Sequence, residues 1–77
     1  MKFKLFLDID SYKCLLKNVP DRAPSRAAIS EAVLLGNTRV VDCDEVQARE
    51  LLVCARSHCP SAVGRLAEAI RAAGIIL

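Results

Sequence analysis

The chain has 77 residues, which is enough for one domain and too few for two, so we expect a single domain over residues 1–77. Its 11 Lys and Arg residues nearly balance 9 Asp and Glu residues and are scattered, which disfavours nucleic-acid binding driven by charge. Apolar residues make up 53% of the chain, a high share for a small body, so part of the apolar surface is expected to meet a partner, with a second copy as the simplest candidate.

The first residues are not expected to form a targeting or membrane segment. Lys2 and Lys4 precede only three apolar residues before Asp8 interrupts them, whereas a secretory core needs about 7–15 apolar residues. No stretch approaches the length of a membrane span. We therefore expect a cytoplasmic protein with no membrane partner, in which the four cysteines are thiols.

The chain opens on a pattern typical of a strand with one buried face, because apolar and charged residues alternate from Lys2 to Asp10 with one break at Phe6. Asp10 or Ser11 is expected to cap a following helix, since a short side-chain oxygen accepts the free amides of the first turn. Pro20 then stops that helix.

At the end of this strand, Asp8-Ile9-Asp10 resembles the first motif of haloacid dehalogenase-type phosphotransferases, in which Asp-x-Asp follows a hydrophobic strand. The resemblance implies a catalytic role for these carboxylates but is confined to this one motif. Tyr12 stands where that family carries Thr or Val, and the chain is too short for the later Ser or Thr, Lys and acidic motifs. We therefore expect Asp8 to face solvent and Asp10 to cap the helix.

Residues 25–35 allow two interpretations. Small and apolar residues after Pro24 favour a short helix. Val33-Leu34-Leu35, followed by Gly36-Asn37, favours a hairpin, because both turn residues tolerate positive φ. The sequence is compatible with both in succession: a helix over about 24–32, then a tight hairpin ending in a strand near 38–43.

The last third of the chain predicts two helices. Asp44 and Gln47 have the spacing of a capping box, and Pro60 suits the first position of the second helix, which Gly74 can end in the left-handed conformation. The apolar faces are Ala48, Leu51, Leu52, Ala55 and Cys59 in the first helix, and Val63, Leu66, Ala67 and Ile70 in the second. The expected fold is α+β: a small two- to three-stranded sheet packed against helices, ending in a C-terminal helical hairpin.

The densest group of reactive side chains is Cys54, His58 and Cys59, with Cys43 at the end of the preceding strand. Cys54 and His58 are four residues apart on one helix, so their side chains point the same way and could share a metal. Structural zinc sites usually offer close pairs such as Cys-x-x-Cys, which this chain lacks. We therefore predict no metal and no cofactor, with Cys43 and Cys59 as core residues, and keep the four-residue set as the alternative.

The same pair, Cys54 and His58, could instead form a thiol-responsive site. His58 lies near a helix C-terminus, where the carbonyl dipole favours its charged form. A charged His58 would lower the pKa of Cys54 and make it reactive. No third group or oxyanion donor is identifiable beside this pair, so the sequence predicts no enzyme.

A second apolar edge indicates where self-association would occur. Val46 and Val53 lie one heptad apart, away from the main apolar face of their helix. The interpretations are two isolated exposed valines or a seam shared with the apolar end Ile75, Ile76 and Leu77. The tail could also cover the chain's own sheet or be disordered.

The expected function is therefore a non-enzymatic protein-interaction or regulatory module in the cytoplasm. We expect it to self-associate as a dimer, and another protein is the second candidate partner. The alternatives are the thiol- or metal-responsive protein and, third, a regulator that binds nucleic acid. For the last, Arg65 and Arg71 are the only basic residues of the final predicted helix and fall on different faces.

Overall fold

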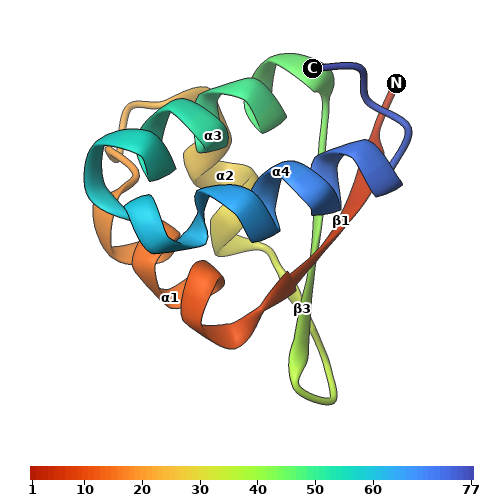
Figure 1. Cartoon of the computed structure of the whole chain (residues 1–77), viewed down its shortest axis with the longest axis horizontal. Coiled ribbons are helices and arrows are strands. Elements are labelled where there is room, and N and C mark those ends of the chain that lie inside the picture. The colour runs from red at the N-terminus through yellow and green to blue at the C-terminus, as the bar shows by residue number, and fades with distance from the viewer.

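Three strands and four helices follow one another in the computed structural model, which describes all residues 1–77 (Figure 1). In chain order they are β1 (Phe3–Asp8), α1 (Ile9–Asn18), α2 (Pro24–Ser30), β2 (Val33–Leu35), β3 (Thr38–Cys43), α3 (Glu45–His58), a 3-10 turn (Pro60–Ala62) and α4 (Val63–Ala72). The α+β class is confirmed, and residues 24–43 form both the short helix and the hairpin that the sequence allowed.

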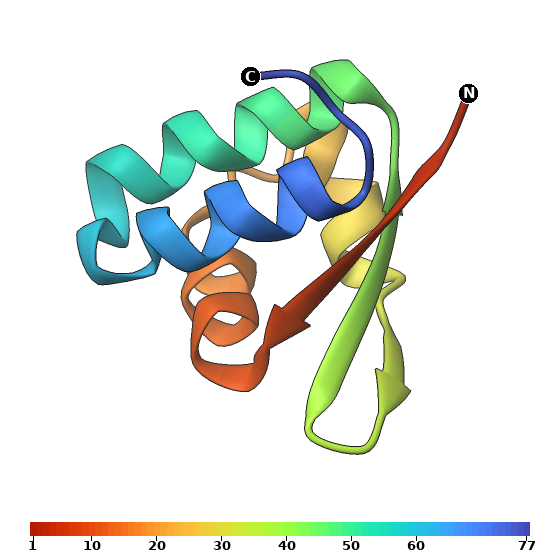
Figure 2. The same cartoon turned by 45° about the vertical axis from the view of Figure 1, so that its right-hand side comes forward.

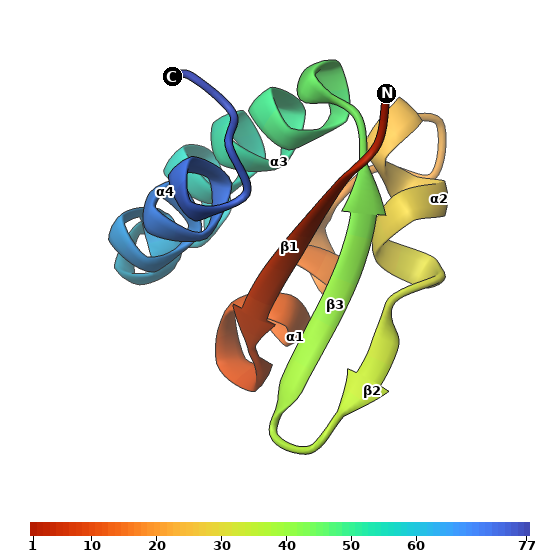
Figure 3. The ribbon, with the colours of Figure 1, turned by 90° about the vertical axis from the view of Figure 1, so that its right-hand side faces the viewer.

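The sheet is antiparallel with the order β1-β3-β2, so β3 lies in the centre and β2 is an edge strand (Figure 3). Gly36 and Asn37 form the two-residue turn between β2 and β3. Gly36 has φ +59, and Asn37 is not among the residues with positive φ. This is the pattern of a turn with glycine at its first central position, which matches the twist of the two strands.

The helices pack against one face of the sheet. On that face β1 and β3 place Leu5 opposite Val41, and both are fully buried. They join a cluster of 18 buried residues from the sheet and all four helices. Figure 2 shows α3 and α4 side by side over this face, with the β2–β3 turn extending beyond the helices. None of the helices combines the length and apolar character needed to cross a membrane.

The expected apolar face of α3 is the one that lies in the core: Ala48, Leu51, Leu52 and Ala55 are all buried. Its capping box is also present, since the Asp44 carboxylate accepts from the Gln47 amide at 2.7 Å and the Gln47 side chain accepts from the Asp44 amide at 2.9 Å. Pro60 differs from the expectation because it opens a 3-10 turn, and α4 begins only at Val63.

Helix α4 ends in a Schellman motif. Gly74 has φ +98, its amide donates to the Arg71 carbonyl at 3.0 Å, and the Ile75 amide donates to the Ile70 carbonyl at 3.2 Å. Ile75 is only 4% exposed and belongs to the core, as does Ile70. The chain direction after α4 is therefore set by this cap.

Asp8, and not Asp10 or Ser11, caps α1. Its carboxylate accepts from the Ser11 amide at 3.1 Å and the Ser11 hydroxyl at 2.6 Å, and it forms an ion pair with Arg65 of α4 at 3.2 Å. The expected cap at Asp10 or Ser11 was wrong because α1 begins at Ile9, directly after the strand, although the Asp8 side chain remains 38% exposed. Partial burial raises the pKa of Asp8, but the Ser11 hydrogen bonds and the Arg65 charge outweigh it and hold the pKa below the ordinary 3.8.

Two further helix ends are capped by side chains from other helices. Ala23 precedes α2 and offers no side-chain cap, and the Glu50 carboxylate of α3 accepts from the Ser25 amide instead, at 2.8 Å. Arg26 of α2 donates to the carbonyls of Leu16 and Val19 at the end of α1. These contacts satisfy free backbone groups that the local sequence leaves open.

Replacing the α1 cap tests this arrangement. Asp8→Ala should lower the free energy of unfolding by about 1 kcal/mol, because the Ser11 amide loses its acceptor. Asp10→Ala is the matched control and should cost no more than about 0.5 kcal/mol, since Asp10 is exposed and makes no capping bond. Urea unfolding at neutral pH measures both, and equal losses would show that Asp8 is not the cap.

The Asp8→Asn variant extends the same test to pH, because asparagine keeps the cap without titrating. A folded-state pKa held below 3.8 means that the charged carboxylate stabilises the fold above this pH, and that its contribution is lost as the pH falls through the folded pKa. The stability of the parent chain should therefore fall more steeply than that of Asp8→Asn below pH 3.8. Parallel curves would contradict the lowered pKa.

Candidate functional site

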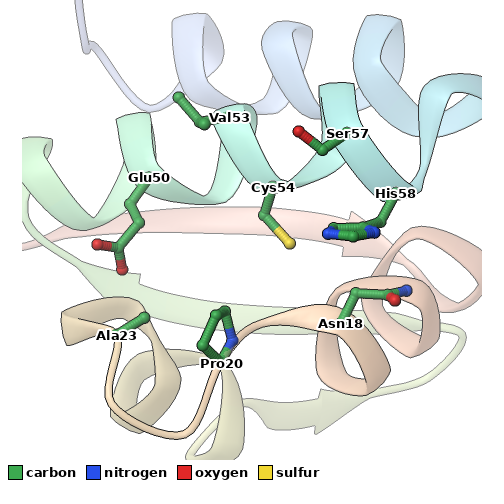
Figure 4. A pocket seen from close by; sticks show the side chains of 8 residues that line it. All are labelled: Asn18, Pro20, Ala23, Glu50, Val53, Cys54, Ser57 and His58. Atoms are coloured by element: carbon green, nitrogen blue, oxygen red, sulfur yellow. The ribbon is translucent and has the colours of Figure 1, made fainter.

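A small pocket lies between α3 and the segment that joins α1 to α2 (Figure 4). Its volume is about 270 Å³. It is lined by Asn18, Pro20, Ala23, Glu50, Val53, Cys54, Ser57 and His58. This is the one pocket of the structure, and it contains three of the side chains that the sequence singled out: Val53, Cys54 and His58.

Helical spacing accounts for the polar side of the pocket. Glu50, Cys54 and His58 follow one another at intervals of four residues on α3, so they form a row along one side of the helix. In Figure 4 the Cys54 sulfur points toward the side on which Pro20 and Asn18 lie. The expectation that Cys54 and His58 point the same way is therefore confirmed.

Cys59 does not share a ligand set with these residues, because it is disulfide-bonded to Cys14 of α1 with a Cα–Cα distance of 6.2 Å. The expectation that all four cysteines are thiols is corrected by this bond. The two residues are 45 positions apart, and only the packing of α1 beside the end of α3 brings them together. Cysteine spacing cannot reveal such a pairing; an even number of cysteines was the only signal in the sequence.

Asn18 connects the disulfide to the pocket. Its side-chain amide donates to the Cys14 carbonyl at 2.8 Å and lies 3.5 Å from the Cys14 sulfur and 3.8 Å from the Cys59 sulfur. Asn18 also lines the pocket. The end of the pocket is thus held by the same covalent link that joins α1 to the end of α3.

The electrostatics of the pocket do not favour a reactive thiol. Burial raises the pKa of Cys54, and the nearby Glu50 carboxylate raises it further. The expected lowering of this pKa by His58 is therefore wrong. Cys43 is fully buried in the core, and burial raises its pKa to about 11, with smaller contributions from Asp44 and Asp42. Both free thiols are protonated at neutral pH.

The alternative metal set is not assembled. Cys43 is the last residue of β3 and is buried in the core, the Cys59 sulfur is bonded to Cys14, and only Cys54 and His58 reach the pocket. No group of three or more His, Cys, Asp or Glu side chains is close enough to hold a metal ion. No residue set in this structure is therefore assigned to a metal or a cofactor.

The residues of the expected self-association seam separate into two kinds. Val46, Val53, Ile76 and Leu77 are exposed, and we call them the helix surface. Arg49 lies between the two valines on α3, and its guanidinium donates to the Ile76 carbonyl at 2.6 Å, so the tail lies beside this side of the helix. Ile75 differs from the expectation because it is buried in the core.

A second exposed apolar group was not singled out from the sequence. Phe6 of β1 and the three residues of β2, Val33, Leu34 and Leu35, are each between 56% and 64% exposed, and we call them the sheet surface. The signal was a run of three apolar residues beside a tight turn. Its exposure could not be foreseen, because it depends on where the helices end.

No protein-family model, no curated protein and no solved structure matches this chain.

Removing the disulfide should reduce stability strongly. The double variant Cys14→Ser, Cys59→Ser is expected to lose about 2–4 kcal/mol of unfolding free energy, because the bond closes a loop with a sequence separation of 45. Cys54→Ser is the control and should lose less than about 1 kcal/mol. Urea unfolding with and without reductant measures both. If reductant leaves the stability of the parent chain unchanged, the bond contributes nothing.

The raised pKa of Cys54 makes a kinetic prediction. At neutral pH the thiol should react with iodoacetamide more slowly than a cysteine in an unfolded peptide, since less thiolate is present. Glu50→Gln should speed the reaction by removing the nearby charge, while its side-chain oxygen can still accept from Ser25. Glu45→Gln, earlier on the same helix, is the control. A parent rate at or above the peptide rate would refute the raised pKa.

Proposed function

We propose that this chain is a non-enzymatic protein-interaction or regulatory module that self-associates, in the simplest case as a homodimer. The observation that carries the proposal is that nine large apolar side chains are exposed on 77 residues. Apart from Met1, they are the four residues of the helix surface and the four of the sheet surface. Two separate apolar surfaces allow the chain to pair with itself through one and to bind another protein through the other.

A loosely folded chain is not the reason for the exposure of these side chains. The accessible surface is 4669 Å², close to the roughly 4,600 Å² that a compact monomer of this mass exposes. The core is closed, with Leu5, Leu15, Ile29, Leu51, Leu66 and Ile70 all fully buried. The exposed apolar groups are thus an addition to a complete core, which favours a binding role for them.

The pocket gives less support to the other classes. Its volume of about 270 Å³ falls below the range of about 300–1,000 Å³ that is usual for small-molecule sites. The thiol alternative is weakened by the raised pKa of Cys54. Nucleic-acid binding is disfavoured further because Arg26, Arg49 and Arg65 make contacts within the chain, to carbonyls or carboxylates.

The expected cytoplasmic location stays part of the proposal under one condition. Disulfides are rare in the reducing cytosol, so Cys14 and Cys59 would there be thiols for much of the time. Alkylation of the protein directly in its cells, followed by unfolding and a thiol count, tests this. Four thiols support the cytoplasm, and a count limited to Cys43 and Cys54 supports an oxidising compartment instead.

The oligomeric state tests the proposed function. Native mass spectrometry and light scattering over a wide concentration series should give a species of twice the 8.4 kDa chain mass that increases with concentration. The dimer should persist in high salt, because its contacts are apolar rather than ionic. A monomer at every concentration would refute self-association.

A further inference from the structure

Strand β2 is uncovered on both faces. Val33, Leu34 and Leu35 are 60%, 64% and 60% exposed. Successive residues of a strand point to opposite faces of a sheet, so exposure of all three means that neither face of β2 is covered. Figure 3 shows the reason: β2 lies at the free edge of the sheet, in a hairpin that extends away from α3 and α4.

The free edge of β2 is short, with three residues, but it lacks the other features that normally prevent pairing. Edge strands are usually protected by charged side chains, proline, a bulge or a covering element. Residues 33–35 contain no charge and no proline, and the strand pairs with β3 without interruption, from Val33 opposite Val40 to Leu35 opposite Thr38. The other edge strand, β1, carries Lys4 and packs against α4. Only β2 is left open.

The backbone of β2 presents its free groups at one central residue. Leu35 and Thr38 close the two-residue turn and so form the hydrogen-bonded pair there. Since hydrogen-bonded and non-hydrogen-bonded pairs alternate along an antiparallel ladder, the amide and carbonyl of Leu34 are directed to the free edge. A second strand can therefore dock with Leu34 at its centre.

We propose that β2 pairs antiparallel with β2 of a second copy, about a two-fold axis at Leu34, to form a continuous six-stranded sheet. This rests on the proposed self-association and names its surface. The two-fold axis places Leu34 opposite Leu34 of the second copy, and Val33 opposite Leu35. At the flanks Glu31 faces Asn37, so no like charges oppose one another.

The outer face of the sheet extends the same contact. Phe6, Val40 and Val33 stand in one row across the three strands on the face away from the core. In the dimer this row continues into Leu35 of the second copy, which joins the two outer faces into one apolar strip. A second copy therefore fits this surface on both its backbone and its side chains. The interface is small, so the dimer forms and separates readily.

Charge placed at the two-fold axis tests the register. Leu34→Lys should weaken dimerisation roughly tenfold or more, because two like charges then face each other. Leu34→Glu should also weaken dimerisation, but less, because Arg39 lies opposite position 34 within each chain and offsets part of the negative charge. An equal mixture of the two variants should recover the dimer as a mixed species, because Lys then faces Glu. Leu34→Thr, which keeps the strand without a charge, should weaken dimerisation less. Circular dichroism verifies that each variant is folded.

Val53→Lys is the matched control, since Val53 is 59% exposed and belongs to the helix surface. It should leave the dimer within about twofold of the parent. If Val53→Lys abolishes the dimer and Leu34→Lys does not, self-association stands and the β2 interface is refuted. Failure of the mixed variants to pair refutes the two-fold register. A parent chain that is always monomeric refutes both self-association and the β2 dimer. If that monomer binds an extended segment of another protein at β2, only the protein-interaction part of the proposed function stands.

Discussion

The packing of α3 against three other helices is the interaction on which the rest of the structure depends. Its buried face contacts α1, α2 and α4, and the two alanines on it, Ala48 and Ala55, allow close approach. The capping box fixes where α3 begins, and the disulfide at Cys59 fixes where α1 lies beside its end. The four helices therefore form one layer, held together by α3, and this layer covers one face of the sheet.

The same helix supplies much of the polar order of the molecule. Glu50 caps α2, and Arg49 donates to the Ile76 carbonyl. The Gln47 side chain accepts from the Asp44 amide at the start of α3 and donates to the Pro24 carbonyl. Side chains of this single helix thus satisfy backbone groups at the starts of α2 and α3 and in the C-terminal tail. These contacts occupy part of its outer side, while Val46 and Val53 stay exposed. Burial and the Glu50 carboxylate raise the pKa of Cys54, the only free thiol that reaches the pocket. The carboxylate that caps α2 therefore also disfavours the reactive thiolate form of Cys54.

The hairpin at the other end of the sheet has the opposite character. Only its strand β3 packs against the helices, and the three apolar residues of β2 remain exposed to solvent. A module of this size has little room for a closed catalytic pocket, but an open strand needs no room inside the domain. This division favours binding at the sheet edge over chemistry at the pocket.

Local sequence determined the elements and the caps at Asp44 and Gly74. The alternation in β1, the face of α3, the capping box at Asp44 and the Gly74 cap all follow from neighbours within a few residues, where periodicity and backbone preference act. Only the tertiary structure decided that Asp8 pairs with Arg65, that Cys14 meets Cys59, that Ile75 is buried and that β2 stays open. These features join residues far apart in the chain or depend on where another element ends. Spacing along a sequence carries no information about such distances in space.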